Sequence, residues 1–177
     1  TKPRASAASV HDAGPVTAPA TQAHEALDTG FLEGLMGYNA RRASMAIGNV
    51  FYERMAPYGL KQADFSVLVL LADNPGATSR QLCATLDILP PNFVRLIGAL
   101  DRRGLIERRP HPQDGRAVGL YLSAEGQALA AETRAVVTEL ETEVVAGLSE
   151  RERDTLRRLL RRFYVGDPAS ASRRSTA

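Results

Sequence analysis

The sequence predicts a mainly α-helical fold that contains one small β-hairpin. Apolar residues recur at three- and four-residue intervals, the spacing of a buried helix face, in several segments between residues 28 and 163. A two-residue alternation, the spacing of a half-buried strand, occurs at Val118, Leu120 and Leu122. Pro and Gly separate these segments and set their ends.

Composition indicates a soluble, cytoplasmic protein of one domain or a closely joined pair. With 177 residues, 44% of them hydrophobic, the chain is long enough to bury a core. No apolar run approaches the roughly 18 residues of a membrane-spanning helix, and the N-terminal segment lacks the apolar core of a secretory signal. The single cysteine, Cys83, excludes an internal disulfide framework. We therefore expect no membrane partner.

Positive charge is concentrated in one segment, although the formal net charge of the chain is only +2. Between Asn92 and Arg116, six arginines stand against three acids, Asp101, Glu107 and Asp114. A local excess of this kind favours a polyanionic partner such as nucleic acid.

The N-terminal part combines a leader without periodicity and a long helix. Residues 1–25 are rich in Ala, Pro, Ser and Thr and are expected to be disordered, with a basic arm that touches DNA as the alternative. Asp28 or Thr29 can cap a helix that continues to about Met55 and stops at Pro57. Its apolar residues fall on several faces, so more than one neighbour must cover it, and a second chain is a natural candidate.

The next helix is predicted from Lys61 to Asp73, and the sequence Asn-Pro-Gly that follows ends it. A core-facing stripe at the i, i+3, i+4 and i+7 positions consists of Phe65, Leu68, Val69 and Ala72.

A short helix starts at Thr78, where Gln81 completes a capping-box pattern. Leu82, Cys83 and Leu86 form its buried side. We interpret Cys83 as a small core residue. The alternative, a redox-sensing thiol, requires exposure and an electropositive setting.

Pro90-Pro91 marks the start of a further helix, where missing amide hydrogens cost little. Near the N-terminus of such a helix, Asn can pair with adenine and Arg with guanine in the major groove of DNA. The alternative is an ordinary solvated face that carries Asn and Arg. The inward face is formed by Phe93, Leu96, Ile97 and Leu100, and the outer face by Asn92, Arg95, Ala99 and Arg102.

Gly104 ends this helix, and two strands are predicted at residues 105–109 and 118–122. The tip between them, Pro110 to Arg116, contains two prolines and a glycine and is not expected to pack into a hydrophobic core. A narrow minor groove attracts an inserted Arg, and Asp114 is well placed to hold Arg116 in position. An ordinary solvated hairpin is the alternative.

Two more helices are predicted after the hairpin. Ser123 caps one that runs to about Gly147, and Ser149 opens another with Glu152 at the capping-box spacing. Acids at the start and arginines at the end of the last helix follow the helix dipole, so we interpret this charge as a solvated face rather than a second nucleic-acid site. Residues 167–177 again have a disordered composition. The apolar stripes are Leu129, Val136, Val137, Leu140, Val144 and Leu148 on the first helix, and Leu156, Leu159, Leu160 and Phe163 on the second.

The order of these elements resembles the MarR family of bacterial transcription regulators, which are winged helix-turn-helix homodimers. The resemblance covers about Phe31 to Phe163 and is strongest between Leu100 and Gly126. There the family has an Asp and an Arg two apart in the wing, then a strand and a Leu-Ser/Thr-x-x-Gly helix start. The matching residues are Asp114, Arg116, Leu120, Leu122, Ser123 and Gly126.

The resemblance implies a winged helix-turn-helix DNA-binding domain at residues 58–122 and a helical dimerisation region at residues 26–57 and 123–166. It implies a homodimer on a double-stranded DNA operator, with the helix from Asn92 in the major groove and Arg116 in the minor groove. The expected DNA-binding residues are Ser79, Arg80, Pro91, Asn92, Val94, Arg95, Arg102, Arg109, Asp114 and Arg116.

The resemblance also implies a small-molecule effector, an aromatic carboxylate or an aromatic acyl-CoA thioester, bound where the first, second and fifth helices meet. Tyr38, Arg42, Met45 and Phe65 are expected to line this pocket, with Arg42 facing a carboxylate or phosphate. The alternative is that the three apolar and aromatic residues are plain core and Arg42 is a surface residue. No cofactor and no metal is expected.

The chain departs from the family's pattern beside the DNA. Pro90-Pro91 stands where small polar residues are usual, which removes both hydroxyl and amide donors to phosphate. Base specificity is therefore expected to depend more on Asn92, on Arg95 and on a methyl contact from Val94.

The expected function is a ligand-released repressor of a catabolic or efflux operon, and not an enzyme. His11 and His24 lie in or beside the leader and His111 lies in the hairpin, and the folded part carries no paired carboxylates, metal-ligand spacing or Gly-rich phosphate loop. Two alternatives stay open at this point: a redox-sensing repressor that uses Cys83, and a non-specific architectural DNA-binding protein.

Overall fold

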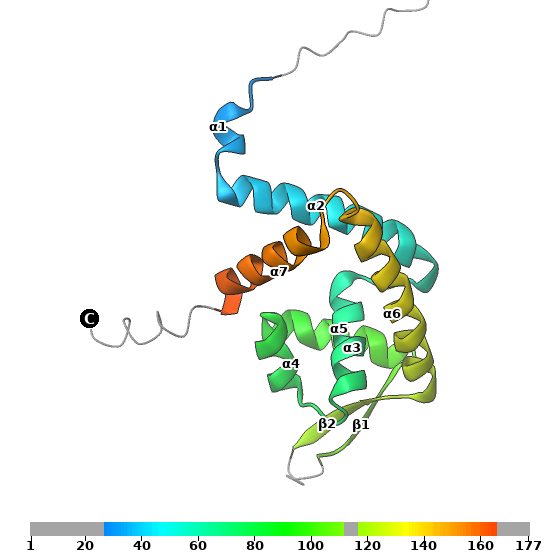
Figure 1. Ribbon diagram of the computed structural model, residues 1–177. Helices are drawn as coiled ribbons and strands as arrows, with labels where there is room; N and C mark the ends of the chain where they lie inside the picture. The colour runs from blue at the N-terminus through cyan, green and yellow to red at the C-terminus, as the bar shows by residue number, and fades with distance from the viewer. Residues whose placement is uncertain (1–26, 112–116, 166–177) are drawn as a thin grey trace, which may run out of the picture. The chain divides into compact units, whose positions relative to one another are not determined.

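The chain is mainly α-helical with one two-stranded antiparallel hairpin, as the sequence predicts (Figure 1). A computed structural model describes residues 27–111 and 117–165. The chain divides into two units, Thr1–Leu35 and Met36–Ala177. The elements are α1 (Gly30–Glu33), α2 (Met36–Met55), the 3-10 turn η1 (Ala56–Tyr58), α3 (Gln62–Asp73), α4 (Ser79–Leu86), α5 (Pro90–Arg102), β1 (Ile106–Pro110), β2 (Val118–Leu122), α6 (Ala124–Val144) and α7 (Glu150–Val165).

The expected continuous helix from Asp28 or Thr29 to Met55 is wrong, because the chain leaves the helical path between α1 and α2. The amide of Leu35 donates to the carbonyl of Leu32, the i→i−3 pattern with which many helices end. Gly34 lies at this break, and glycine costs about 1 kcal/mol relative to alanine in a helix interior.

Helix α6 packs against both α2 and α3 in the second unit. Met55, at the end of α2, is fully buried. Beside it, the Tyr58 hydroxyl donates a 2.9 Å hydrogen bond to Glu132 of α6, which raises the pKa of Tyr58. Arg54 forms an ion pair with Glu143 of α6. The end of α2 thus packs along α6 through the buried Met55, with the polar contacts of Arg54 and Tyr58 at the surface beside it.

The predicted core stripe of α3 is correct at Leu68, which is fully buried, and Phe65 packs against the core from a half-buried position. Val67 and Leu71 are buried, whereas Ala72 is exposed and the other two predicted positions are half-buried. Helix α3 packs against α2, α4, α5, α6 and β2. A helix covered on several sides buries more than a single narrow stripe, so the spacing rule alone does not locate its core positions.

Strands β1 and β2 pair in antiparallel register, with Ile106 opposite Leu122. The loop between α3 and α4, which the sequence did not place beside the hairpin, lies on the other side of β2. The amide of Gly76 donates to the carbonyl of Leu120 at 2.9 Å, and the amide of Leu120 donates to the carbonyl of Ala77 at 3.0 Å. The hairpin is therefore hydrogen-bonded to the loop between α3 and α4.

Leu120 and Leu122 of β2 are buried, as predicted. Val118, predicted to face inward, is exposed, and Gly119 is buried instead. Gly119 forms a bridge with Thr78, and a Cβ added to it would lie 2.9 Å from the carbonyl oxygen of Gly76. Only glycine permits this approach of two backbones.

The start of α6 is tied to the start of the hairpin. The Ser123 hydroxyl accepts a 3.0 Å hydrogen bond from the amide of Gly126 and donates one of 2.6 Å to the carbonyl of Gly104. The Ser123 amide donates to the carbonyl of Leu105 at 3.1 Å. Ser123 thus caps α6, as predicted, and also joins it to the residues that precede β1.

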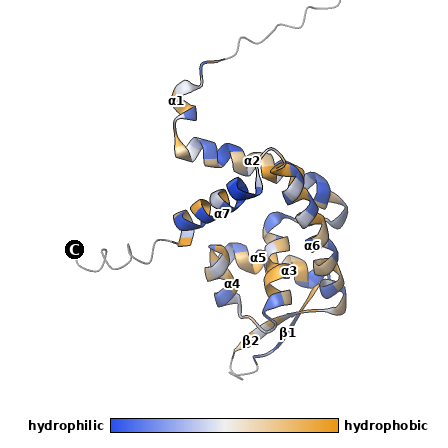
Figure 2. Cartoon of the chain, in the orientation of Figure 1, coloured by the Kyte–Doolittle hydropathy of each residue, from blue (hydrophilic) through white to orange (hydrophobic). Residues whose placement is uncertain are grey.

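Helix α7 has no buried residue. Its predicted capping box is confirmed, since the Ser149 amide and hydroxyl donate to Glu152 at 2.8 and 2.6 Å. These hydrogen bonds lower the pKa of Glu152, and the one from the Ser149 hydroxyl makes the larger contribution. Hydrophobic and hydrophilic residues alternate along α7 in Figure 2. The exposed large hydrophobic side chains of α7 are Leu156, Leu159, Leu160, Phe163, Tyr164 and Val165, and the first four form the predicted stripe.

Candidate nucleic-acid interface

Helices α4 and α5 pack together and form a helix-turn-helix. At the start of α4 the predicted capping box is present: the Gln81 amide donates to the Thr78 hydroxyl at 3.3 Å, and the Thr78 amide donates to the Gln81 side chain at 2.8 Å. Asp87 ends α4 with a left-handed φ of 51°, a conformation that Asp tolerates better than most residues. This turn directs the chain into α5.

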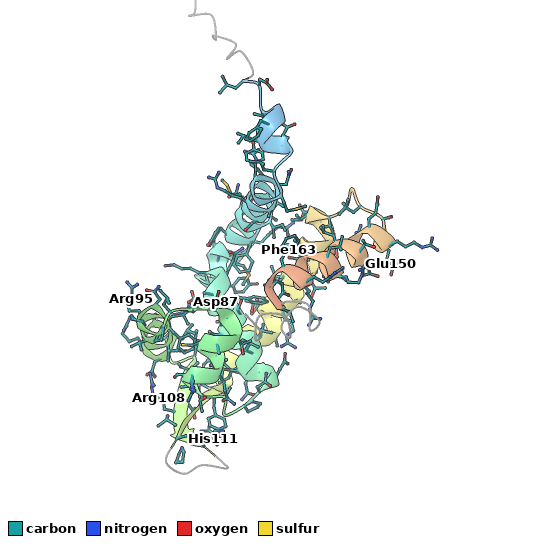
Figure 3. All side chains as sticks on the ribbon, turned by 90° about the vertical axis from the view of Figure 1, so that its left-hand side faces the viewer. Asp87, Arg95, Arg108, His111, Glu150 and Phe163 are labelled. Carbon is teal, nitrogen blue, oxygen red and sulfur yellow. The ribbon has the colours of Figure 1, made fainter. Side chains whose placement is uncertain are left out.

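Burial fixes which face of α5 is available to a partner. Phe93, Ile97 and Leu100 are at most 2% exposed, which confirms three of the four positions predicted for the inward face. In Figure 3 the Arg95 side chain points away from the body of the domain. The expected DNA-binding residues that are exposed on α5 are Pro91, Asn92, Val94, Arg95 and Arg102.

The two residues expected to read bases contact each other. The Arg95 guanidinium donates a hydrogen bond of 2.5 Å to the side-chain oxygen of Asn92. Arg carries five N–H donors in a planar fork, so most of its donors stay available. Asn92 and Arg95 therefore form one polar surface in the first two turns of α5.

Several arginines of the basic segment are engaged within the protein. Arg103 donates to the carbonyls of Tyr58 and Gly59 at 2.8 and 3.0 Å, which ties the end of α5 to η1. Arg108 pairs with Asp101 at 3.3 Å, across from α5 to β1. Arg103 is therefore held by the backbone of the protein itself, whereas the exposed ion pair of Arg108 leaves that arginine available to a partner.

The other expected DNA contacts lie on α4 and the hairpin. Ser79 and Arg80 are exposed at the first turn of α4. On β1, Arg109 forms an ion pair with Glu107, and its guanidinium lies 5.1 Å from the centre of the Tyr121 ring. Asp114 and Arg116, the expected minor-groove residues, lie outside the described residues.

Cys83 is half-buried on α4 and packs against the hydrophobic core. This placement agrees with its interpretation as a small core residue. Its use as a redox sensor stays a prediction without structural support.

A cavity of about 480 Å³ lies among α2, α3, α6 and α7. We call it the effector cavity, after the ligand site that the family resemblance leads us to expect. Phe65 and Ile47 contribute apolar surface, while Arg134, Arg153 and Glu141 contribute charge. The meeting of these helices is where the resemblance placed a ligand.

Of the four expected effector residues, Phe65 lines this cavity. Tyr38, Arg42 and Met45 share one face of α2 nearer its N-terminus and are not among the lining residues. Their role in binding an effector stays a prediction.

No group of three or more His, Cys, Asp or Glu side chains within residues 27–111 and 117–165 is placed to hold a metal ion. In that same part of the chain, no helix combines the length and the apolar character needed to cross a membrane.

Comparison with known proteins agrees with this geometry. A MarR family model matches residues 58–117, from η1 through the helix-turn-helix and into the hairpin. A protein of Thauera aromatica, whose name assigns it to the transcriptional regulation of the hcr operon, is 31% identical over 140 residues, which cover 78% of this chain and 84% of the relative. The chain belongs to the MarR family. Its α4–α5 pair and β1–β2 hairpin are thus the winged helix-turn-helix of a MarR-type DNA-binding transcriptional regulator, and the hairpin is its wing.

Solved structures of MarR-type regulators share the fold. The transcriptional repressor CouR bound to a 23-mer DNA duplex is 38% identical, with a TM-score of 0.72, and the match covers 77% of this chain and 96% of CouR. CouR from Rhodococcus jostii RHA1 bound to p-coumaroyl-CoA is 25% identical, with the same TM-score of 0.72 and the same coverage, 77% and 96%. The resemblance drawn from the sequence is confirmed.

Proposed function

We propose that this MarR-family regulator is a homodimeric repressor that binds a near-palindromic operator and is released by an aromatic carboxylate or its CoA thioester. The observation that carries the proposal is the outward face of α5, where Asn92 and Arg95 form an exposed polar pair above the buried Phe93 and Ile97. An exposed Asn and Arg near a helix N-terminus suit the edges of adenine and guanine in the major groove.

Two copies of this surface are needed to read two half-sites about one helical turn apart, roughly 34–36 Å. The exposed apolar side of α7, which includes Leu159 and Phe163, supports a second copy as the partner that covers it. Since the target of a repressor is chromosomal DNA, the proposal carries a cytoplasmic location with it.

The effector cavity supports the ligand part of the proposal. It combines the Phe65 ring with the guanidinium groups of Arg134 and Arg153, which suits a ligand with an aromatic body and a negative charge. A CouR neighbour is bound to p-coumaroyl-CoA, and that ligand has both features. Release requires only that the effector bind more tightly to a dimer conformation in which the two α5 helices are not spaced to fit the two half-sites.

The test is fluorescence anisotropy of DNA that flanks the protein's own gene, with a scrambled duplex of equal length as control. We expect specific binding to the flanking DNA, and a shift of the binding curve on addition of p-coumarate or p-coumaroyl-CoA but not of p-coumaramide. Equal affinity for both duplexes, with the same steep salt dependence, would instead identify a non-specific architectural protein. A response to peroxide that is lost in Cys83→Ser would identify a redox sensor.

A further inference from the structure

A larger cavity, of about 680 Å³, lies where the base of the wing meets α3 and the first half of α6. We call it the sub-wing cavity. Its volume falls in the range of small-molecule sites, roughly 300–1,000 Å³. Leu71, Leu122 and Ala130 give it a buried apolar floor. It opens on a different part of the domain from the effector cavity and shares only Arg134 with it.

Two arginines from separate elements line the sub-wing cavity. Arg109 comes from β1 and lies over the Tyr121 ring, while Arg134 comes from α6 and donates to Asp73 at 2.9 Å. The side chains of Arg109 and Arg134 are 56% and 45% exposed. Ion pairs this exposed contribute little to stability, so their arginines are available to an incoming anion.

The chemistry of this lining defines a ligand class. Guanidinium groups bind carboxylates in a planar, bidentate manner, and they also stack on aromatic faces. An apolar floor between two such groups suits a flat molecule with a negative charge at one edge. Tyr121 adds an aromatic face on the wing side of the cavity.

We propose that the sub-wing cavity binds a small planar anion, of the aromatic carboxylate class, through Arg109 and Arg134. This site is additional to the effector cavity, and ligand binding there does not depend on the proposed repressor function. If the chain also acts as proposed, a ligand here would take the Arg109 guanidinium away from DNA phosphate and lower operator affinity.

The test uses backbone amide NMR of the full chain titrated with trans-cinnamate, and with cinnamamide as the uncharged match. We expect cinnamate to shift the amides of Gln127 and Ala130 saturably, because both residues line the sub-wing cavity. Cinnamamide should bind there at least tenfold more weakly. The amides of Ile47 and Val69 report separately on the effector cavity.

Variants then locate the site. Ala131 lines the sub-wing cavity and Ala128 does not, although both are exposed on α6. Ala131→Phe should weaken cinnamate binding at Gln127 at least tenfold, while Ala128→Phe should leave it within twofold of the parent. Arg109→Gln should weaken binding at least fivefold. Thermal unfolding followed by circular dichroism verifies that each variant folds. If Ala131→Phe does not fold, the cinnamate affinity of Arg109→Gln tests the site instead.

The outcomes separate this proposal from the proposed function. Shifts at Ile47 and Val69 with none at Gln127 would overturn the sub-wing site and leave the repressor proposal intact. Cinnamate affinity at Gln127 that is unchanged in Arg109→Gln would overturn it as well. Saturable shifts at Gln127 in a protein that binds no specific operator would support the site and overturn the repressor proposal.

Discussion

Gly126 has no room for a side chain, because a Cβ there would lie 2.0 Å from the carbonyl oxygen of Leu105. The same carbonyl accepts the Ser123 amide at 3.1 Å. The Leu-Ser-x-x-Gly motif is thereby explained physically: the serine caps α6, and the glycine lets the chain before β1 lie against it.

We expect Gly126→Ala to lower the free energy of unfolding by about 3 kcal/mol, since overpacking against backbone has no cheap relaxation. Urea denaturation measures the change. Gly147→Ala is the matched control, because a Cβ at Gly147 meets nothing within 4 Å. Equal midpoints for the two variants would contradict this account of the motif.

Arg95 should contribute both affinity and base choice. Arg95→Ala is expected to cost roughly 1–3 kcal/mol of operator binding and to relax specificity at one position of each half-site. Arg80 is an expected DNA-binding residue in the first turn of α4, outside the helix that reads the bases. If it contacts phosphate, Arg80→Ala should weaken binding evenly across sequences and reduce its salt dependence. Binding of a randomised operator library distinguishes the two effects. An Arg95→Ala protein that binds operator as well as its parent would show that α5 is docked in another orientation.

Asn92 and Arg95 should also fail to act independently, because they are hydrogen-bonded. Contacting residues commonly show coupling energies of about 0.5–3 kcal/mol. The loss in operator affinity for the double alanine variant should therefore differ from the sum of the two single losses.

Sequence reasoning located the outward face of α5 because helical periodicity is a local property. It did not predict which arginines are engaged, since their partners depend on the tertiary fold. Arg103 bonds to the carbonyls of Tyr58 and Gly59, which are 45 and 44 residues away in the chain. Arg134, which lines both cavities, gave no signal in the sequence for the same reason.

At the scale of elements, the sequence correctly predicts the helix starts that are formed by a capping box, in which the capping residue pairs with a side chain three residues later. Thr78 and Ser149 both form the expected capping boxes. Helix ends were less accurate, as α6 stops at Val144 rather than near Gly147. The backbone hydrogen bonds that join Gly76 and Ala77 to Leu120 were missed because they connect residues far apart in the chain.

The α7 capping box makes a pH-dependent contribution to stability. The folded-state pKa of Glu152 is lowered, so the stabilisation is present above the ordinary glutamate pKa and is lost as pH falls through the lowered value. Ser149→Ala should return the pKa of Glu152 towards its ordinary value, as measured by carboxyl NMR titration. An unchanged titration would show that the hydroxyl is not the cause.

At the scale of the whole molecule, the apolar side of α7 should be an interface between copies. Leu159→Glu places a charge among exposed apolar side chains and should convert the proposed dimer to a monomer at micromolar concentration. Operator affinity should fall at least tenfold, because a monomer reads one half-site. Light scattering after size exclusion measures the mass.

Arg158→Glu is the control for this experiment, since it makes a larger change of charge on the polar side of the same helix. It should leave the mass unchanged. Retention of the dimer by Leu159→Glu would place the interface elsewhere in the chain.

Thr78 takes part in two structures at once, the cap of α4 and the bridge to Gly119 in β2. The start of α4 and the base of the wing should therefore open as one cooperative unit. We then expect the amides of Gly76 and Leu120 to be protected from hydrogen exchange to the same degree. Gln81→Ala, which removes half of the cap, should then accelerate exchange at Leu120 in the wing. If exchange accelerates only in α4, then α4 and the wing open independently of each other.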